Sequence, residues 1–475
     1  MSEPNTLHMK KSGKNNIEVK DRKRILVLGG GFAGIEVLRR LENKFENDFT
    51  VDLTMVSKNN FFLFTPMLPE VASGMIETRH IVTPVRAFCK RARFYEATVR
   101  SIDFQKRQVT ISNVIGNGND LANWHDHTLD YDYLILSLGG ETNFFGMEDV
   151  KKCSYTMKSL GDAIVLRNHA IDMLEQASIE QDGELRKSLM TFVVVGGGFA
   201  GVETIGELNA LVRDAARGFY HDIDIQDIRV VLVNATDKIL PEVSEDLSKF
   251  AAQKLKESGI EIILKNPVSS ATASTVKLQD GTVIETNTLV WAGGVTPEKI
   301  VKELQCEHDR GGRIIVDGYL EVKGFDGIYA LGDCASITDK NTGRPYPPTA
   351  QNAVEQAKVV ASNLISTIRG GNKIIFNYKS RGIMAQIGKR SGVGILFGMK
   401  THGLLAWMIW RTYYLSHLPT LEKKLRVLTD WSIDLFFKPD ITRLKTFTEA
   451  QDIQTKVFSD TVNLAPTRET KSETT

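Results

Sequence analysis

The sequence predicts an α/β fold made of two Rossmann-like dinucleotide-binding domains. A short apolar strand, ILVLG from Ile25, runs directly into a glycine-rich loop and then into a helical pattern. The same order returns over residues 191–208. The loop sequence GGGFAG at 29–34 is repeated letter for letter at 196–201. Chance agreement of that length is improbable, so we interpret the two segments as an internal repeat of one nucleotide-binding unit.

Length and composition narrow the possible functions. A chain of 475 residues exceeds the size at which one hydrophobic core stops growing, so two or three domains are expected. A net charge of +1 argues against a nucleic-acid partner, because phosphate binding normally needs a clear basic excess. The cysteines lie far apart without a CxxC pair, which favours small core residues in a reduced protein over a disulfide framework or a metal site. These cysteines are Cys89, Cys153, Cys306 and Cys334.

The two ends of the chain are polar. Residues 1–22 carry lysines and no apolar run, so we expect a disordered lead-in rather than a secretory signal. Residues 441–475 are expected to form a frayed tail. Nowhere is there a run of about 18 uncharged apolar residues, so no membrane-spanning helix is expected.

Each loop supplies three glycines for three separate reasons. The first permits a tight turn, the second lets the backbone approach a pyrophosphate, and the third allows the helix to pack closely on the strand. The pyrophosphate would lie at the helix N-terminus, where free N–H groups and the helix dipole favour negative charge. The glycines are Gly29, Gly31 and Gly34 in the first unit and Gly196, Gly198 and Gly201 in the second.

Neither unit has the acidic residue that usually ends the second strand and binds the ribose. The first unit has Ser57 and Lys58 there, and the second has Asn234. Ser57 and Asn234 can still hydrogen-bond a hydroxyl. Because Asn234 carries no charge that would repel a 2′-phosphate, the sequence favours NADH but leaves NADPH open.

A third strand pattern, GIYALGDCA over residues 327–335, ends at Gly332 and Asp333 and precedes a helix predicted to begin near Thr349. A carboxylate at a strand end can hydrogen-bond the ribityl chain of a flavin. The alternative is an ordinary Asx turn. In a chain with two Rossmann loops we favour the flavin interpretation and predict that Gly332 and Asp333 close the first site.

Six segments together resemble the type II NADH dehydrogenases, which are single-subunit NADH:quinone oxidoreductases. The resemblance covers Lys23 to Pro439 and implies a glutathione-reductase-like architecture. It also implies a non-proton-pumping reaction that passes a hydride from NAD(P)H to FAD and two electrons to a membrane quinone. The segments are GGGFAG at 29–34, NNFFLFTPMLPEVASG at 59–74, GGGFAGVE at 196–203, WAGGV at 291–295, ALGDCA at 330–335 and PPTAQNAVEQA at 347–357.

The resemblance also implies roles for individual residues. FAD contacts are implied for Gly29, Gly31, Phe32, Ala33, Gly34, Ser57, Lys58, Val99 and Asp333, with Thr65 and Pro66 near the flavin ring. Gly198 and Glu203 are implied to lie by the nicotinamide, with Asn234 at the ribose. A quinone pocket with catalytic roles for Gln351 and Glu355 is implied beside Ala350, although the family often carries glutamine at the position of Glu355.

Two of these assignments have plainer alternatives. Residues 350–357 could be an ordinary first helical turn whose alanines serve packing. Glu203 lies in the first turn of its helix, so it could merely complement the helix dipole, as Glu36 could in the first unit.

The C-terminal region changes character after about Lys379. An aromatic-rich block, LLAWMIWRTYYLSHL at 404–418, precedes a basic amphipathic stretch that runs to about Phe437. Tryptophan and tyrosine beside basic residues are typical of helices that lie in the membrane interface. We predict a monotopic protein on the cytoplasmic face of the cell membrane. Ordinary core packing is the alternative, and a homodimer is also expected.

The predicted domains follow from these motifs. Residues 23–155 and 296–380 form a discontinuous FAD domain, 156–295 the NAD(P)H domain and 381–440 the membrane-association region. Rival functions remain open. A sulfide:quinone oxidoreductase needs paired redox cysteines, and a dithiol–flavin reductase needs a CxxxxC after the first helix, which is absent. A non-catalytic NAD(P)H-sensing flavoprotein is the third rival.

Overall fold

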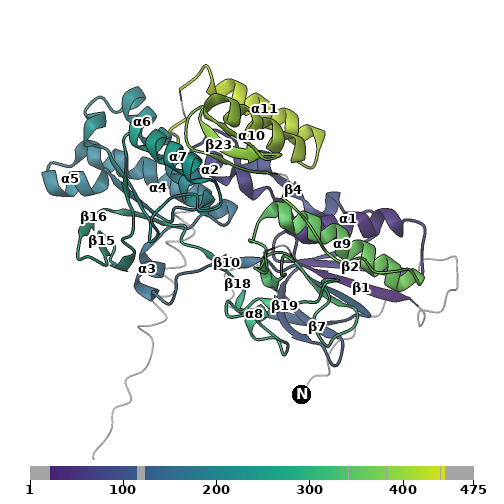
Figure 1. The fold of residues 1–475 in the computed structure, drawn as a ribbon. Helices are drawn as coiled ribbons and strands as arrows, with labels where there is room; N and C mark the ends of the chain where they lie inside the picture. Colours follow the sequence, from purple (N-terminus) through teal and green to yellow (C-terminus); the bar gives the residue numbers. More distant parts are fainter. Residues whose placement is uncertain (1–21, 115–123, 341, 381, 439, 444–475) are drawn as a thin grey trace, which may run out of the picture.

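The computed structural model describes residues 22–114, 124–340, 342–380, 382–438 and 440–443 (Figure 1). The predictions for residues 1–21 and 444–475 fall outside these ranges. The described chain forms two α/β units joined by a narrow link, with a third, smaller region seated on one of them (Figure 1).

The first unit is built on a parallel sheet in the order β20-β9-β1-β2-β5. Its strands are continuous apolar segments, and Val27 and Leu28 of β1 are completely buried, as expected for a parallel sheet covered on both faces. Helices α1 and α9 pack side by side on one face (Figure 1). These elements are β1 Lys23–Leu28, α1 Phe32–Lys44, β2 Val51–Ser57, β5 Arg93–Glu96, β9 Tyr133–Leu136, β20 Ile328–Ala330 and α9 Ala350–Arg369.

The second unit repeats this plan with a parallel sheet in the order β13-β12-β11-β17. In both units a central strand leads through the glycine loop into a long helix and then to a parallel neighbour, so the predicted repeat is confirmed. The elements are α4 Leu160–Ile179, α5 Gly183–Leu189, β11 Thr191–Val195, α6 Phe199–Phe219, β12 Arg229–Val233, α7 Glu245–Glu257, β13 Ile260–Ile263 and β17 Thr288–Trp291.

Smaller elements complete the two units. Antiparallel sheets are formed by β6 Thr98–Asp103, β7 Gln108–Val114 and β8 Trp124–Asp130, by β14 Val268–Ala271, β15 Thr275–Leu278 and β16 Val283–Glu285, and by β3 Phe61–Leu63 with β4 Val82–Pro84. The short helices are η2 Thr65–Met67, α2 Leu68–Ala72, η3 Thr78–Ile81, η4 Val85–Ala87, α3 Glu148–Cys153, η5 Ile225–Asp227, α8 Lys299–Lys302 and η6 Gly332–Cys334. A parallel pair joins β19 Ile314–Ile315 to β21 Ala335–Ser336.

Both chain connections between the units pass through one small antiparallel pair, β10 Gly140–Thr142 with β18 Val295–Pro297. Beyond β10 the chain packs at once on the second unit. Phe144 stacks on Trp291 with ring centres 6.0 Å apart, and the amide of Ala271 donates to Asp149 in α3 at 3.0 Å. The chain therefore enters the second unit through β10 and returns through β18, and the domain boundaries at residues 155 and 295 stay a prediction.

The third region follows α9. It consists of an antiparallel sheet, β22 Gly382–Gln386, β23 Gly392–Leu396 and β24 Met399–His402, and two helices, α10 Gly403–His417 and α11 Leu421–Asp434. Helix α10 packs on this sheet, while β22 packs on α6 (Figure 1). The sequence predicts both helical segments correctly. Within the described ranges, no helix combines the length and apolarity needed to cross a membrane.

Candidate functional site

The first glycine loop has the geometry that a bound pyrophosphate requires. Gly29 adopts a φ of +105°, and a Cβ there would lie 2.1 Å from the carbonyl oxygen of Ser137. A Cβ on Gly34 would lie 1.9 Å from the carbonyl oxygen of Gly29. By contrast, a Cβ on Gly31 would meet no described atom within 4 Å. The outer glycines are therefore required by the backbone, and the middle one faces open space at the start of α1.

The second loop repeats this geometry. Gly196 has a φ of +117°, and a Cβ there would lie 2.4 Å from the carbonyl oxygen of Ala292. A Cβ on Gly201 would lie 1.9 Å from the carbonyl oxygen of Gly196, whereas one on Gly198 would again meet nothing described within 4 Å. Two cradles of the same shape, each opening at a helix N-terminus, fit two dinucleotide cofactors.

The strand-end residues differ in what they contact. Ser57 is buried at the end of β2, whereas Lys58 reaches outward and pairs with Glu298 at 2.9 Å. Asn234 follows β12, and its Oδ1 accepts from the amide of Gly197 at 3.0 Å. Its Nδ2 donates to the carbonyl oxygen of Lys238 at 2.9 Å. The Asn234 side chain therefore holds the second glycine loop in place by linking the backbone of Gly197 to that of Lys238.

Gly332 and Asp333 lie where the first unit closes. A Cβ on Gly332 would lie 3.6 Å from the Cβ of Ala33 and 3.9 Å from that of Ala353, so the starts of α1 and α9 meet at this turn. The Asp333 carboxylate lies 3.4 Å from the Lys158 ammonium group. The acidic side chain beside the first glycine loop is thus balanced by a cation from the second unit, and its contact with FAD stays a prediction.

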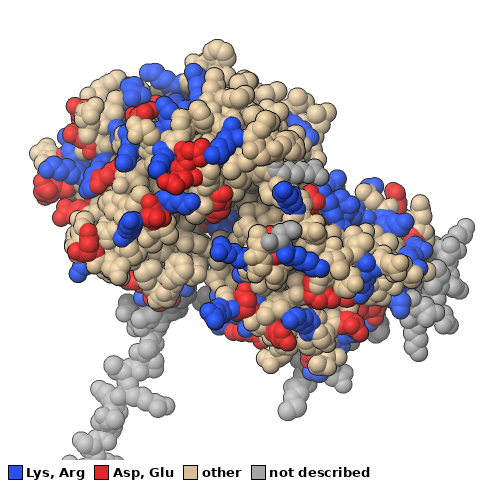
Figure 2. Space-filling view, in the orientation of Figure 1, with Lys and Arg blue, Asp and Glu red and all other residues tan. Residues whose placement is uncertain are grey.

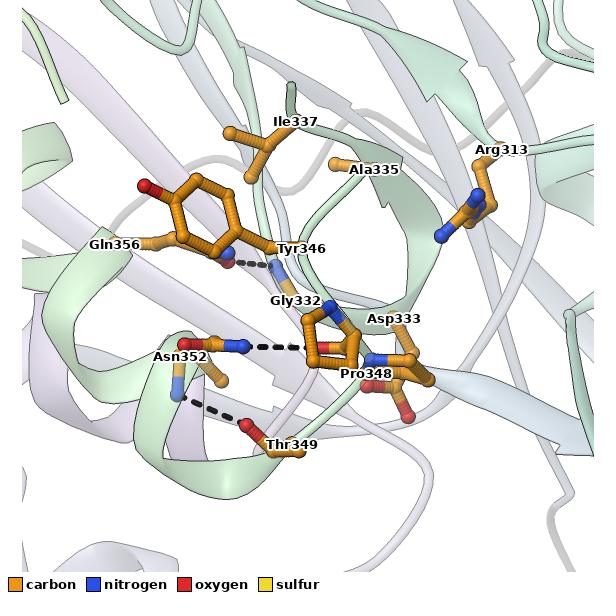
Figure 3. A pocket seen from close by; sticks show the side chains of 12 residues that line it. Arg313, Gly332, Asp333, Ala335, Ile337, Tyr346, Pro348, Thr349, Asn352 and Gln356 are labelled. Atoms are coloured by element: carbon orange, nitrogen blue, oxygen red, sulfur yellow. Dashed lines mark hydrogen bonds between the residues drawn. The ribbon is translucent and has the colours of Figure 1, made fainter. Parts of the chain in front are cut away.

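Helix α9 begins at Ala350 with Thr349 as its N-cap, as predicted (Figure 3). Two turns in, the buried side chain of Gln356 accepts a hydrogen bond from the amide of Gly332 at 2.8 Å (Figure 3). Gln356 therefore anchors the turn that presents Asp333. The sequence interpretation missed this residue and assigned a role to its neighbour Glu355. The helical spacing from Thr349 carries the signal, because Gln356 shares the buried face of α9 with Asn352 and Ala353.

The predicted quinone-site residues lie on the less buried side of α9. Gln351 accepts from the hydroxyl of Ser380 at 3.3 Å. Glu355 pairs with Lys358 at 2.6 Å, so the charge that Glu355 brings is balanced locally. Ala350 is half-buried at the start of the helix.

Four further residues predicted to contact FAD lie in η2, β6 and α1 of the first unit. Thr65 and Pro66 begin η2, where Thr65 is exposed and Pro66 is half-buried. Val99 is half-buried in β6. Phe32 opens α1 and stacks edge-on against Phe62, with ring centres 4.9 Å apart.

Glu203 points away from its own helix terminus toward the C-terminal region. Its Oε1 accepts from the amide of Gln386 at 3.0 Å and from the indole of Trp410 at 3.2 Å. Desolvation raises the pKa of this carboxyl to about 8. The equivalent Glu36 instead pairs with arginines on its own helix. Glu203 is therefore more than a partner of the helix dipole.

Two further buried carboxyl groups, Glu70 and Glu207, lie near Glu203 and were not predicted. Glu207 accepts from the hydroxyl of Ser73 at 2.7 Å, and Glu70 lies 3.5 Å from the guanidinium of Arg411. Burial raises the pKa of Glu207 to about 7 and that of Glu70 to about 8. The four-residue spacing of Glu203 and Glu207 signals one helical face, whereas no local pattern predicts Glu70.

The cysteines do not form a redox pair in the described part of the chain, where all of them are free. Burial raises the pKa of the Cys89, Cys306 and Cys334 thiols to about 11. At neutral pH these groups remain thiols, which are poor nucleophiles.

Comparison with known proteins places the chain in a family. Residues 23–357 match the pyridine nucleotide-disulphide oxidoreductase family, and residues 380–440 match the NDH2 C-terminal domain. The chain is 31% identical over 430 residues to a probable NADH dehydrogenase of Dictyostelium discoideum, covering 90% of this chain and 92% of that one. It is also 31% identical over 426 residues to the type II NADH:quinone oxidoreductase Ndh of Mycobacterium tuberculosis, covering 87% and 88%.

Solved structures share the fold. NDH2 from Plasmodium falciparum in complex with NADH superposes with a TM-score of 0.81 at 20% identity, covering 89% of this chain and all of that one. The sulfide:quinone oxidoreductase of Aquifex aeolicus gives a TM-score of 0.65 at 16% identity, covering 88% and 96%. The glutathione-reductase-like prediction is thereby confirmed at the level of the α/β fold. The chain belongs to the pyridine nucleotide-disulphide oxidoreductase family and, within it, to the type II NADH:quinone oxidoreductases.

Proposed function

We propose that this protein oxidises NADH and reduces a membrane quinone at a site between its two α/β units and its C-terminal region. Bound FAD supplies the redox chemistry, accepting a hydride equivalent from NADH and giving up two electrons to the quinone. The observation that carries the proposal is the pair of glycine cradles with the same geometry, one in each unit. Homologues named type II NADH:quinone oxidoreductases support the acceptor.

In this proposal the first unit holds FAD. The amides around Gly31 receive the pyrophosphate, and Asp333 orients the ribityl chain from a turn fixed by Gln356. The Lys158 ammonium group pairs with the Asp333 carboxylate at 3.4 Å and helps to fix its position. Ser57, Lys58, Val99, Thr65 and Pro66 are proposed to complete the contacts.

The second unit is proposed to hold NADH at Gly196, Gly198 and Gly201. Asn234 contributes by bracing this loop, since its amide already contacts backbone at Gly197 and Lys238. Glu203 is proposed to border the nicotinamide side of the site. On the other side, Ala350, Gln351 and Glu355 are proposed to line the quinone pocket.

The C-terminal region is proposed to bind the membrane surface. Helices α10 and α11 and the β23–β24 turn expose large apolar side chains, and Figure 2 shows a mostly uncharged surface over these helices. Basic residues Lys423, Lys424 and Arg426 lie on α11, as expected for a helix that lies in the interface. The exposed apolar residues are Phe397, Met399, Leu404, Leu405, Met408, Leu421, Leu425, Leu428, Ile433, Leu435, Phe436 and Phe437.

The catalytic proposal is tested by steady-state kinetics. NADH oxidation should depend on a soluble quinone, and sulfide should not replace NADH as the donor. Turnover with sulfide and none with NADH would overturn the assignment. Binding of NADH without turnover would favour the sensor alternative.

Flotation with anionic vesicles tests the membrane proposal. The double variant Leu425→Glu, Phe436→Glu should lose vesicle binding, since each glutamate puts a negative charge on the apolar face. The matched control Val283→Glu, at an exposed apolar residue of the second unit, should bind like wild type. A shift from dimer to monomer in the double variant, with vesicle binding unchanged, would instead identify this surface as a homodimer interface. The cytoplasmic location stays a prediction.

A further inference from the structure

Three carboxyl groups gather where α2, α6, α10 and α11 meet. Glu70 and Glu207 are each 1% exposed, and Glu203 lies beside them on α6. Among the described residues, Arg411 is the cation that makes an ion pair with this group, at 3.5 Å from Glu70. Three carboxylates beside one guanidinium would leave buried negative charge, which is strongly unfavourable. The cluster is therefore neutralised in part by protons.

Hydrogen bonds tie the cluster together. Gln386 on β22 spans two of its members, donating from its main-chain amide to Glu203 at 3.0 Å and from its Nε2 to Glu207 at 2.7 Å. The Ser73 hydroxyl lies 2.7 Å from Glu207 and 3.1 Å from the carbonyl oxygen of Glu70. The side-chain oxygen of Gln386 is buried and accepts no hydrogen bond from any described residue. The Oε1 atom of Gln386 is thus a hydrogen-bond acceptor without a described donor, on the residue that bridges Glu203 and Glu207.

Further titratable and charged groups from α6, α10, α11 and the β22–β23 turn surround the cluster. Asp434 on α11 acts on both Glu207 and Arg411, and Lys389 acts on Glu207 and Asp434. Tyr414 on α10 lies near Glu203, and Asp214 on α6 pairs with Lys389. Arg390 also acts on Asp434.

The proposed reaction needs a proton that the hydride does not provide. NADH donates two electrons and one proton as a hydride, while a quinone becomes a quinol by taking two electrons and two protons. One proton per turnover must therefore come from water. Glu203 is the cluster member that we place at the site, and Glu207 lies one helical turn further from it.

We propose that Glu207, with Glu70 as its second member, forms a proton store that supplies this one proton to the site through Glu203. The inference rests on the proposed function. In each turnover one O–H bond of the store breaks and its proton moves toward Glu203. A proton from water at the Asp434 side then restores the carboxyl, so no electron enters or leaves the store. Glu207 is a positioning residue in this scheme, since it does not contact the substrate.

Full-length, FAD-loaded Glu207→Gln tests the proposal. The half-reaction with NADH alone should stay within about twofold of wild type, because it consumes no external proton. Quinone reduction should slow by about a hundredfold at pH 6, where Glu207 holds its proton, as expected for lost acid catalysis, and less at pH 8, where the wild-type carboxyl has itself released its proton. Glu36 occupies the position in the first glycine motif that Glu203 occupies in the second. The control variant Glu36→Gln should leave both half-reactions and their pH dependence unchanged.

Infrared titration gives a readout that does not depend on turnover. Wild type should show protonated carboxyl absorbance, and Glu207→Gln should lack the component that disappears near pH 7, while the components of Glu70 and Glu203 remain. Ser73→Ala removes a donor that favours the ionised form, so the midpoint of this band should move to higher pH. If Glu207→Gln loses FAD, Glu207→Asp keeps an ionisable group and should restore both the band and the rate.

Two results would overturn the store. One is an unchanged carboxyl band in Glu207→Gln, and the other is an equal slowing of both half-reactions at every pH. Absence of NADH:quinone turnover in the wild-type protein would instead overturn the proposed function, while the infrared band would still report the store.

Discussion

Neighbouring glycines in one loop have different roles, as the position of an added Cβ atom shows. At Gly34 a Cβ would clash with the carbonyl oxygen of Gly29, whereas at Gly31 it would extend into open space. The former position is required by the protein backbone, and the latter by the ligand. Identical letters in a motif therefore carry different consequences.

Gly34→Ala should lower the melting temperature of the FAD-free protein, because backbone at 1.9 Å must move. Gly31→Ala should leave that temperature near wild type but weaken FAD binding, since its methyl group occupies the path of the pyrophosphate. Thermal unfolding of the stripped protein and FAD titration check the pair. Equal losses of stability in the two variants would contradict this assignment.

We predict that Asn234 influences the choice between NADH and NADPH. Asn234→Asp keeps the acceptor for the Gly197 amide and adds a negative charge beside the ribose. A charge pair near a protein surface is worth a few kcal/mol at most, so we expect NADP⁺ binding to weaken by roughly tenfold more than NAD⁺ binding. Calorimetric titration of both nucleotides measures this difference. Parallel changes in the two affinities would show that Asn234 acts only on the loop.

At the scale of elements, the Arg411 guanidinium is one of the contacts that hold α10 and α11 to the rest of the chain. Arg411 lies 4.0 Å from the ring centre of Trp407 and 4.5 Å from that of Trp431, and it pairs with Glu70 on α2. Such stacking and ion pairing suit arginine better than lysine. The helix pair is thereby fixed to the segment that follows Thr65 and Pro66.

Arg411→Met should destabilise the docking of this helix pair by about 1–3 kcal/mol, because it leaves the buried Glu70 carboxyl, protonated near neutral pH, without its polar partner. The double variant Arg411→Met, Glu70→Leu should recover most of that loss. Hydrogen exchange of residues 403–434 reports the docking directly. A double variant as unstable as the single one would show that the ion pair is not what holds the helices.

Features that depend on residues close together in the chain are predicted from the sequence. Features that depend on contacts between distant parts of the chain are missed. The glycine loops, the helix cap at Thr349 and both C-terminal helices are encoded within a few residues, so local patterns reveal them. Gln356 and Glu207 carry only a faint periodic signal. The pairing of Glu70 with Arg411 joins residues far apart in the chain, and no local pattern encodes such a contact.

At the scale of the whole molecule, the buried acids make stability depend on pH. The pKa values of Glu70 and Glu207 rise from 4.5 to about 8 and 7, so near neutrality the folded chain holds protons that the unfolded chain has released. The free energy of unfolding should therefore fall as pH rises from about 5 to 8, by up to about 1.4 kcal/mol per pH unit for each group.

Melting temperatures of the FAD-loaded protein across this range provide the measurement. The double variant Glu70→Gln, Glu207→Gln should show a flatter profile than wild type, since neither side chain can release a proton. An identical slope would mean that other groups cause the dependence.

The interrupted path of the first unit also sets an order of synthesis. Its edge strand β20 and the covering helix α9 are made only after the whole second unit, which is continuous from α3 to β17. On the ribosome the second unit can fold while the first still lacks a strand, since domains generally fold as units during synthesis. We therefore expect a nascent chain that ends before Asp333 to bind FAD more weakly than the complete chain, because it lacks the turn and the helix that close the first unit.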